Sequence, residues 1–158
     1  MIPVKIGIID IGDETMREAA SMLLPGYVFN EADVIILGAQ TEEGLVAGAV
    51  AIERIEAPDA ENEMFRLCHM EVLAELRRQG IGTVLLDAVT SFFAEREDTV
   101  DLTIWYDMED ARNGFDSFIA GSRLFDITEE KVNRKNVYIA LWNGKTFDTL
   151  EEEEDEEE

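Results

Sequence analysis

The sequence predicts an α/β domain, α+β-like in character, in which helices flank a mixed, mostly antiparallel sheet. Two observations favour this fold class. A strongly amphipathic helix is expected over residues 81–92, and a hairpin with an apolar second strand is expected over residues 34–55. The expected elements follow the order strand, helix, several strands, helix, strand, helix and strands. That order indicates a mixed sheet rather than a regular series of parallel strands.

The first elements are a strand and a helix. An apolar run over residues 4–9 is typical of a short strand. Asp13 can cap a helix that continues to Leu24, where Pro25-Gly26 would stop it.

A hairpin and a further strand follow. Thr41-Glu42-Glu43-Gly44 is a suitable loop between strands over residues 34–37 and 45–55. The second of these strands is apolar on both faces, which predicts a position inside the sheet. Another strand is expected over residues 64–73.

The clearest helix follows that strand. Its apolar residues recur at the i, i+3, i+4, i+7, i+8 and i+11 positions of one helical face. They are Ile81, Val84, Leu85, Ala88, Val89 and Phe92.

The C-terminal third predicts further strands and one short helix. Strands are expected over residues 100–105 and 137–142, with a weaker one over 127–132. A helix is expected over residues 113–120, ending at Gly121. The aromatic residues of this region are expected in the core. They are Trp105, Phe115, Phe118 and Trp142.

The chain is strongly acidic, with a net charge of −23. Residues 151–158 are all acidic and are expected to form a disordered tail after a single domain over residues 1–150. The rest of the chain still has 28 acids against 13 bases. This balance argues against nucleic acid or an anionic membrane as a partner, and it favours a small-molecule amine, a polyamine or a basic peptide.

The composition indicates a cytoplasmic protein. No stretch approaches the roughly 18 apolar residues that cross a bilayer, and the N-terminal residues lack the pattern of a secretory signal. The single cysteine, Cys68, cannot form an internal disulfide, and no metal-binding motif surrounds it. The sequence leaves open whether the protein is a monomer or a homodimer.

The segment Arg77-Arg78-Gln79-Gly80-Ile81-Gly82-Thr83 joins a buried strand to the amphipathic helix. Its glycines let the backbone approach a ligand closely, and the first N–H groups of a helix attract phosphate. Two arginines add positive charge to a chain that otherwise repels anions. A P-loop would need Gly-Lys-Ser/Thr here, and a dinucleotide fingerprint would need a third glycine where Leu85 stands.

This segment resembles the acetyl-coenzyme A motif of the GCN5-related N-acetyltransferase (GNAT) family. The resemblance rests on Arg77-x-x-Gly80-x-Gly82, with Val72 ahead and Leu85-Leu86 behind. The order of expected elements matches that fold over about residues 4–142. It implies that the backbone amides of residues 78–83 bind the pyrophosphate of acetyl-CoA. It also implies that Val72 pairs with the pantetheine arm, and that a cleft beside the 100–105 strand receives the thioester.

The family often carries Asn-x-x-Ala-x-x-x-Tyr-x-x-x-Gly-Phe after that strand, and its tyrosine protonates the departing thiolate. Two alignments remain open here. Aligning Gly121 with the motif glycine puts Ser117 at the tyrosine position, whereas aligning Asn113 with the motif asparagine puts Ala120 there. Neither supplies a phenol. Tyr106 and Ser117 are therefore the candidate acids, and Asn113 is a candidate contact to the cofactor.

The candidate general base is Glu71, beside Val72, with Glu63 as an alternative. Strand alternation places Glu71 opposite Met70 and Val72, so only a distorted strand would turn it into the cleft. His69 shares the parity of Glu71 and is expected to be structural. Adjacent strand residues face opposite sides, which argues against a nucleophilic pair of His69 and Cys68.

The leading hypothesis is therefore an acetyl-CoA-dependent N-acetyltransferase that acts on a primary amine by direct attack, without a metal. Two alternatives remain. One is a degenerate module that binds coenzyme A without chemistry. The other is an interaction protein that uses its acidic surface and tail.

Overall fold

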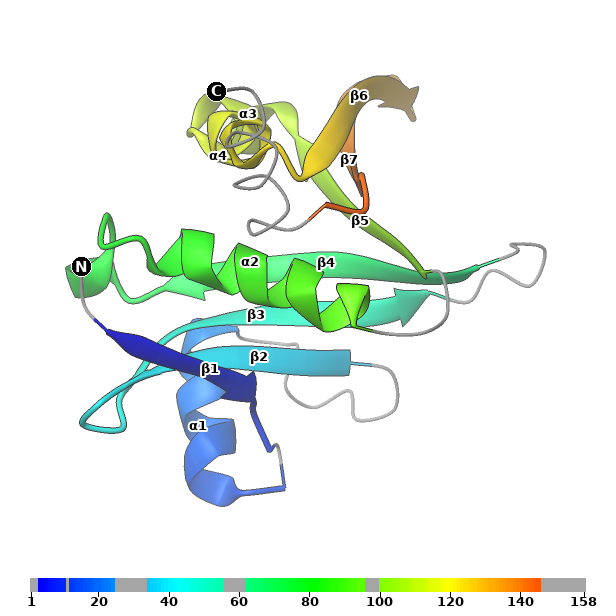
Figure 1. Cartoon of the computed structure of the whole chain (residues 1–158). Coiled ribbons are helices and arrows are strands. Elements are labelled where there is room, and N and C mark those ends of the chain that lie inside the picture. Colours follow the sequence, from blue (N-terminus) through cyan, green and yellow to red (C-terminus); the bar gives the residue numbers. More distant parts are fainter. Residues whose placement is uncertain (1–2, 11, 25–33, 56–61, 96–99, 146–158) are drawn as a thin grey trace, which may run out of the picture.

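The computed structural model describes residues 3–10, 12–24, 34–55, 62–95 and 100–145. They form one seven-stranded sheet in the order β1-β2-β3-β4-β5-β7-β6, with helices against it (Figure 1). The strands are β1 Val4–Ile8, β2 Val34–Thr41, β3 Val46–Ile55, β4 Glu63–Val72, β5 Val100–Asp107, β6 Phe125–Val132 and β7 Lys135–Trp142. The helices are α1 Glu14–Leu23, the single 3-10 turn η1 Ala74–Leu76, α2 Ile81–Ala94, α3 Met108–Arg112 and α4 Phe115–Ser122.

The predicted fold class is confirmed. Neighbouring strands are antiparallel except for β4 and β5, which are parallel. None of the described helices has the length and apolar character needed to cross a membrane.

Helix α1 begins where the sequence predicts. The Asp13 carboxylate accepts a hydrogen bond from the Met16 N–H at 3.1 Å, which satisfies one of the free N–H groups of the first turn. The predicted stop at Pro25-Gly26 lies outside the described residues.

The two long helices cover opposite faces of the central strands. Apolar residues of α2 and the facing side chains of β2 to β5 form one buried cluster, whereas α1 packs with the other side chains of β2 and β3 in a second cluster. Helix α2 approaches β3 closely at Gly48. A Cβ atom there would lie 3.1 Å from both Ile81 Cγ2 and Leu85 Cδ1. The absence of a side chain at Gly48 thus lets the start of α2 rest directly on the sheet.

Strands β4 and β5 separate halfway along β4. They pair from Glu63 with Val100 to Leu67 with Ile104, and the pairing stops there. Figure 1 shows β5 leaving β4 and carrying β7, β6, α3 and α4 away from the N-terminal half of the sheet. The last five residues of β4, 68–72, therefore have no strand partner on the β5 side.

The helix predicted over residues 113–120 is present as α4, and a further short helix, α3, precedes it. Helix α3 starts earlier because the Asp107 carboxylate caps it, accepting from the Asp110 N–H at 2.9 Å. Gly114 then ends the turn with φ 98°, a conformation that favours glycine, and α4 begins at Phe115. The start predicted at residue 113 was therefore wrong by two residues, and α3 itself was not predicted.

The prediction that Trp105 lies in the core was also wrong. Its side chain is 49% exposed, whereas Ile104 and Tyr106 on either side are buried. Strand alternation thus turns Trp105 to the open face of β5, where the Arg66 guanidinium lies 5.8 Å from its ring centroid. The other predicted core aromatics, Phe115, Phe118 and Trp142, are partly buried against the core.

Candidate active site

A pocket of about 260 Å³ lies at the start of α2. It is formed by the end of β4, the loop that follows, the first turn of α2 and one ring from α4. Its lining residues are Val72, Leu76, Arg77, Arg78, Gly80, Ile81, Gly82, Thr83 and Phe118. Most of the residues predicted to bind the cofactor therefore come together here, although Gln79 is not part of the lining.

The first turn of α2 is open to an anionic ligand. Gly80 is the N-cap residue, with φ 81°, and no side chain caps the helix. The first intrahelical bond runs from the Val84 N–H to the Gly80 carbonyl at 3.1 Å. The N–H groups of Ile81, Gly82 and Thr83 consequently have no partner within the helix, and the positive end of its dipole adds to their attraction for phosphate.

The loop before α2 is held in an unusual backbone conformation. Arg78 has φ 67°, in the left-handed region that glycine tolerates best. Placing a side chain there costs about 1–2 kcal/mol. Strain of this kind is found where a backbone is arranged for a ligand, and the loop here curves around the pocket.

Arg77 is turned away from the expected phosphate position. Its Nε donates to the Val72 carbonyl at 3.2 Å, and its Nη2 donates to Glu71 Oε1. Arg77 thus ties the loop to the end of β4. Both arginines are exposed, but only Arg77 forms an ion pair among the described residues, so the Arg78 side chain remains available to a ligand.

The end of β4 presents a main-chain edge to the gap between β4 and β5, where the Val72 carbonyl already accepts a hydrogen bond from Arg77. The Leu73 N–H donates to the Ala47 carbonyl of β3 at 2.8 Å. Because main-chain groups alternate in direction along a strand, the N–H and carbonyl of Val72 point away from β3. They face the side that β5 has left, where an extended ligand can add to the sheet.

A second pocket, of about 250 Å³, occupies the opening between the two strands; we call it the cleft. Residues of β4 form one wall, and β5, α3 and α4 form the other. Its lining residues are Leu67, Cys68, His69, Met70, Glu71, Ile104, Trp105, Tyr106, Asp110 and Phe115. The cleft adjoins the first pocket, since Glu71 is followed by Val72 and the rings of Phe115 and Phe118 lie 6.3 Å apart.

Glu71 lines the cleft, and β4 has an irregularity shortly before it. The pairing of β3 with β4 shifts between Ala51–His69 and Ile52–Leu67, so that Cys68 is an extra residue, a β-bulge. From His69 to Val72 the register is regular again, so Glu71 still lies opposite Met70 and Val72. Met70 and Glu71 both line the cleft, at the end of β4 that β5 has left. Glu71 Oε2 lies 3.5 Å from His69 Nε2, and Oε1 accepts from Arg77.

The alternative base is at the other end of β4. Glu63 pairs with Val100 in the joined part of the sheet and forms an ion pair with Arg54 at 3.6 Å. It does not line the cleft.

Tyr106 lies deep in the opposite wall of the cleft, only 4% exposed. Its hydroxyl donates a hydrogen bond to Asp116 Oδ1 at 2.6 Å. Burial raises the pKa of the Tyr106 phenol well above its ordinary value, and the hydrogen bond to Asp116 raises it further. Tyr106 therefore stays protonated through the neutral range.

The remaining predicted site residues lie outside both pockets. Ser117 is exposed on α4, and Asn113 is the exposed residue that ends α3. Neither lines the cleft or the pocket at α2.

Cys68 lines the cleft as a thiol. Its Sγ lies 3.4 Å from Glu53 Oε2. Burial raises the pKa of the Cys68 thiol, and the Glu53 carboxylate acts in the same direction. Within the described part of the chain, no three His, Cys, Asp or Glu side chains gather closely enough to hold a metal ion.

Asp116 and Trp105 are site residues that sequence reasoning missed. Asp116 follows Tyr106 by ten residues, across the break between α3 and α4, and no local pattern pairs them. The exposure of Trp105 could have been predicted from strand alternation. Its neighbours Ile104 and Tyr106 are buried, so Trp105 lies on the opposite face.

Solved acetyltransferases share this fold. The structure is similar to Arabidopsis thaliana NAA60 in complex with acetyl-CoA, with a TM-score of 0.64 and 13% identity over 89% of this chain and 98% of that one. It is also similar to the aminoglycoside acetyltransferase meta-AAC0020 from an uncultured soil metagenomic sample, in complex with sisomicin. The TM-score is 0.64, and the identity is 18% over 82% of this chain and 91% of that one. It is also similar to a ribosomal-protein-alanine N-acetyltransferase from Brucella melitensis biovar Abortus 2308. The TM-score is 0.55, and the identity is 20% over 73% of this chain and 90% of that one.

At these identities, the likeness to solved structures concerns the fold. No curated protein matches the sequence. The sequence model that describes the acetyltransferase (GNAT) family matches residues 9–116, which is more than half of the chain and includes α2, the cleft strands and Asp116. The chain therefore belongs to the acetyltransferase (GNAT) family.

Proposed function

We propose that this protein transfers the acetyl group of acetyl-CoA to a primary amine by direct attack. The observation that supports this most is the adjacency of two pockets along β4. One offers free N–H groups at the start of α2, and the other holds Glu71 and Tyr106 on facing walls. A ligand with a phosphate at one end and a reactive group at the other fits this arrangement.

The chain offers a suitable partner to each part of the coenzyme. The N–H groups of residues 81–83 and the side chain of Arg78 suit the pyrophosphate. The main-chain edge at Val72 suits the amides of the pantetheine arm. The thioester would then enter the cleft between β4 and β5. The similar NAA60 structure, which is in complex with acetyl-CoA, supports this donor.

The chemistry needs a proton acceptor and, at the leaving group, a proton donor. A neutral amine attacks the thioester carbonyl, a C–N bond forms, and the C–S bond breaks. Glu71 takes the proton that the amine loses, directly or through a water molecule. Tyr106 faces Glu71 across the cleft, and burial keeps its phenol protonated. It can therefore supply the proton that the departing thiolate gains.

Direct attack is favoured over a covalent acetyl-enzyme. The only cysteine of the chain is Cys68, and its pKa is raised, whereas a nucleophilic cysteine needs a lowered one.

The acceptor is proposed to be a small-molecule amine or a peptide. The net charge of −23 attracts cations over long range. Trp105 and Asp110 line the cleft and suit an amine, through the face of the indole and through the carboxylate. The similar structures include an acetyltransferase in complex with sisomicin and a NatC complex bound to a Gag peptide, which supports both classes.

A second candidate function is a module that binds coenzyme A without turnover. It is favoured by the existing hydrogen bonds of the two proposed catalytic groups. The Tyr106 proton is directed at Asp116, and Glu71 already accepts from Arg77.

Two measurements test the proposal. Coenzyme A or acetyl-CoA should raise the melting temperature, since a ligand at a hundred times its dissociation constant stabilises the native state by about 2.7 kcal/mol. Release of free thiol from acetyl-CoA should then depend on an added amine. Stabilisation without turnover across a broad amine panel would favour the binding module, and the lack of any stabilisation would refute both functions.

A further inference from the structure

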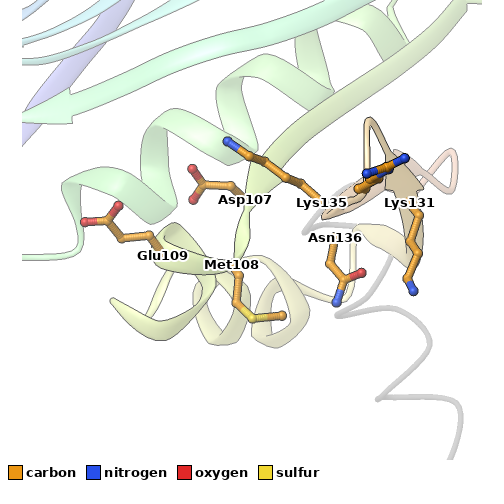
Figure 2. Close-up of a pocket in the computed structure, with 7 residues that line it drawn as sticks. Asp107, Met108, Glu109, Lys131, Lys135 and Asn136 are labelled. Atoms are coloured by element: carbon orange, nitrogen blue, oxygen red, sulfur yellow. The ribbon is translucent and has the colours of Figure 1, made fainter.

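A third pocket, of about 490 Å³, lies where the β6–β7 hairpin meets the end of β5. We call it the hairpin pocket (Figure 2). Three basic residues, Lys131, Arg134 and Lys135, line it together with Asp107 and Glu109. No part of the proposed acetyl-CoA site overlaps this lining.

The hairpin turn brings the three basic residues together. Lys131 pairs with Asn136 and Val132 with Lys135, leaving Asn133 and Arg134 as the two turn residues. Both have positive φ, 53° and 66°, as a type I′ turn requires. Such a turn most often uses glycine at its second position, and arginine there is strained. The chain thus places a cation at a position where glycine would be easier to accommodate.

The charge of the hairpin pocket differs from that of the rest of the chain. The protein has 36 acidic residues and 13 basic ones, whereas three bases and two acids line this pocket. Lys131, Arg134 and Lys135 form no ion pair with any carboxylate in the described ranges. Their positive charges are therefore available to an anion that enters the pocket.

The hairpin pocket and the cleft share a wall. Asp107 directly follows Tyr106, and its carboxylate caps the turn that leads to Asp110, which lines the cleft. Figure 2 shows the Lys135 side chain extending toward Asp107, whereas Lys131 extends the opposite way. The opening therefore has the Lys135 ammonium group on the side of Asp107, next to the cleft, and the Lys131 ammonium group on the far side.

We propose that the hairpin pocket binds an anionic group of the acceptor, so that the substrate is an amine that also carries a carboxylate or phosphate. This inference rests on the proposed acetyl transfer and adds the class of acceptor. The amine enters the cleft past Asp107 and Asp110, and the anionic end is attracted to the basic side chains of the hairpin. Asp107 and Glu109 would repel a long polyanion, which favours a ligand with one anionic group.

Matched acceptor pairs test this class. Alanine peptides of two to four residues with a free C-terminal carboxylate are compared with their C-terminal amides, and phosphoethanolamine is compared with ethanolamine. The anionic member of at least one pair should have the higher kcat/KM, by about tenfold, through a lower KM. Whether the preference is larger for the peptides or for phosphoethanolamine identifies the anionic group.

Variants connect this preference to the hairpin pocket. The triple variant Lys131→Gln, Arg134→Gln and Lys135→Gln should lose the preference while keeping its melting temperature and its affinity for coenzyme A. The control is Lys5→Gln, which removes an exposed cation on β1, at the opposite edge of the sheet. It should keep the preference.

Calorimetric binding of the same pairs, with coenzyme A present, separates this inference from the proposed function. A binding preference for the carboxylate or phosphate member of a pair, lost in the triple variant, supports the hairpin pocket. If that preference is found but no amine is acetylated, the proposed acetyl transfer is contradicted and the inference about the hairpin pocket stands. Equal binding of all pairs, or a preference that survives in the triple variant, overturns the inference. A preference that appears only after residues 151–158 are removed also overturns it, because the acidic segment would then be the occupant in the full chain.

Discussion

The Tyr106 hydroxyl lies 2.6 Å from the Asp116 carboxylate, and this hydrogen bond joins the separated end of β5 to α4. Tyr106 also stacks on Tyr138, with ring centroids 5.3 Å apart, and meets the edge of Phe115 at 5.0 Å. These contacts fix the phenol in the wall of the cleft. The bond to Asp116 therefore positions the only described tyrosine that lines the cleft.

Tyr106→Phe should lower kcat if the phenol protonates the thiolate. We expect a loss of about 10²-fold, at the lower end of the range for general acids, because a thiolate is a fairly good leaving group. Affinity for coenzyme A should change little, since Tyr106 lies outside the pocket at α2. Ser117→Ala is the control, because Ser117 is exposed and outside the cleft. A larger loss with Ser117→Ala than with Tyr106→Phe would transfer the role to the serine.

The same phenol should make stability depend on pH in the alkaline range. The pKa of Tyr106 is higher in the folded protein than in the unfolded chain, where a tyrosine ionises near about pH 10. The folded state therefore holds more protons above that pH, and stability is lost as the pH rises. Denaturant unfolding should show this loss in the wild type and a smaller one in Tyr106→Phe. Equal pH dependence in both proteins would contradict the assignment.

Glu71→Gln should lower the rate while leaving coenzyme A binding intact. The amide keeps the shape of the side chain but cannot accept the amine proton, and general bases typically contribute about 10²- to 10⁴-fold. In the wild type, the rate should rise with pH through one ionisation, because only the neutral amine attacks. The matched control is Glu63→Gln, on the same strand but outside the cleft. An unchanged rate in Glu71→Gln would show that a water chain or another group accepts the proton.

Gly82→Asp should weaken coenzyme A binding far more than it destabilises the fold. A Cβ atom at Gly82 would lie 3.5 Å from Phe118 Cζ, an ordinary contact, so the new side chain fits sterically. Its carboxylate would, however, stand among the N–H groups that face the phosphate. Gly82→Ala should bind nearly normally, and Gly121→Asp on α4, where a Cβ meets nothing within 4 Å, tests the added charge alone. Tight binding by a folded Gly82→Asp variant would place the pyrophosphate elsewhere.

The sequence predicted the fold class, the strands and α2 because these depend on periodic apolar patterns and on glycines at fixed spacing. The pocket at α2 could be predicted for the same reason, as it is built from consecutive residues. The cleft could be predicted only in part. Glu71 lies opposite Met70 and Val72, as alternation predicts, yet it lines the cleft because β5 leaves this end of β4 open.

Contacts between distant segments account for the remaining misses. The Tyr106–Asp116 bond depends on how Gly114 separates α3 from α4, a division that the apolar pattern does not reveal. Arg77 illustrates the same limit. Its charge predicted a phosphate contact, but the fold places Glu71 and the Val72 carbonyl within its reach, and it binds them instead.

The strained loop at Arg78 provides a last prediction, which separates backbone conformation from charge. Arg78→Gly should stabilise the folded protein by up to about 1 kcal/mol, because glycine accepts φ 67° while its own greater freedom in the unfolded chain offsets part of the gain. The same change should weaken coenzyme A binding, with a smaller dependence on salt, because it removes an exposed cation beside the free N–H groups of α2. Arg78→Lys keeps the charge and the strain, so it should match the wild type in both melting temperature and affinity. Denaturant unfolding and calorimetry at two salt concentrations measure the two effects. If Arg78→Gly binds coenzyme A as tightly as the wild type, the arginine serves neither to attract the phosphates nor to hold them, and the N–H groups of α2 carry the binding alone.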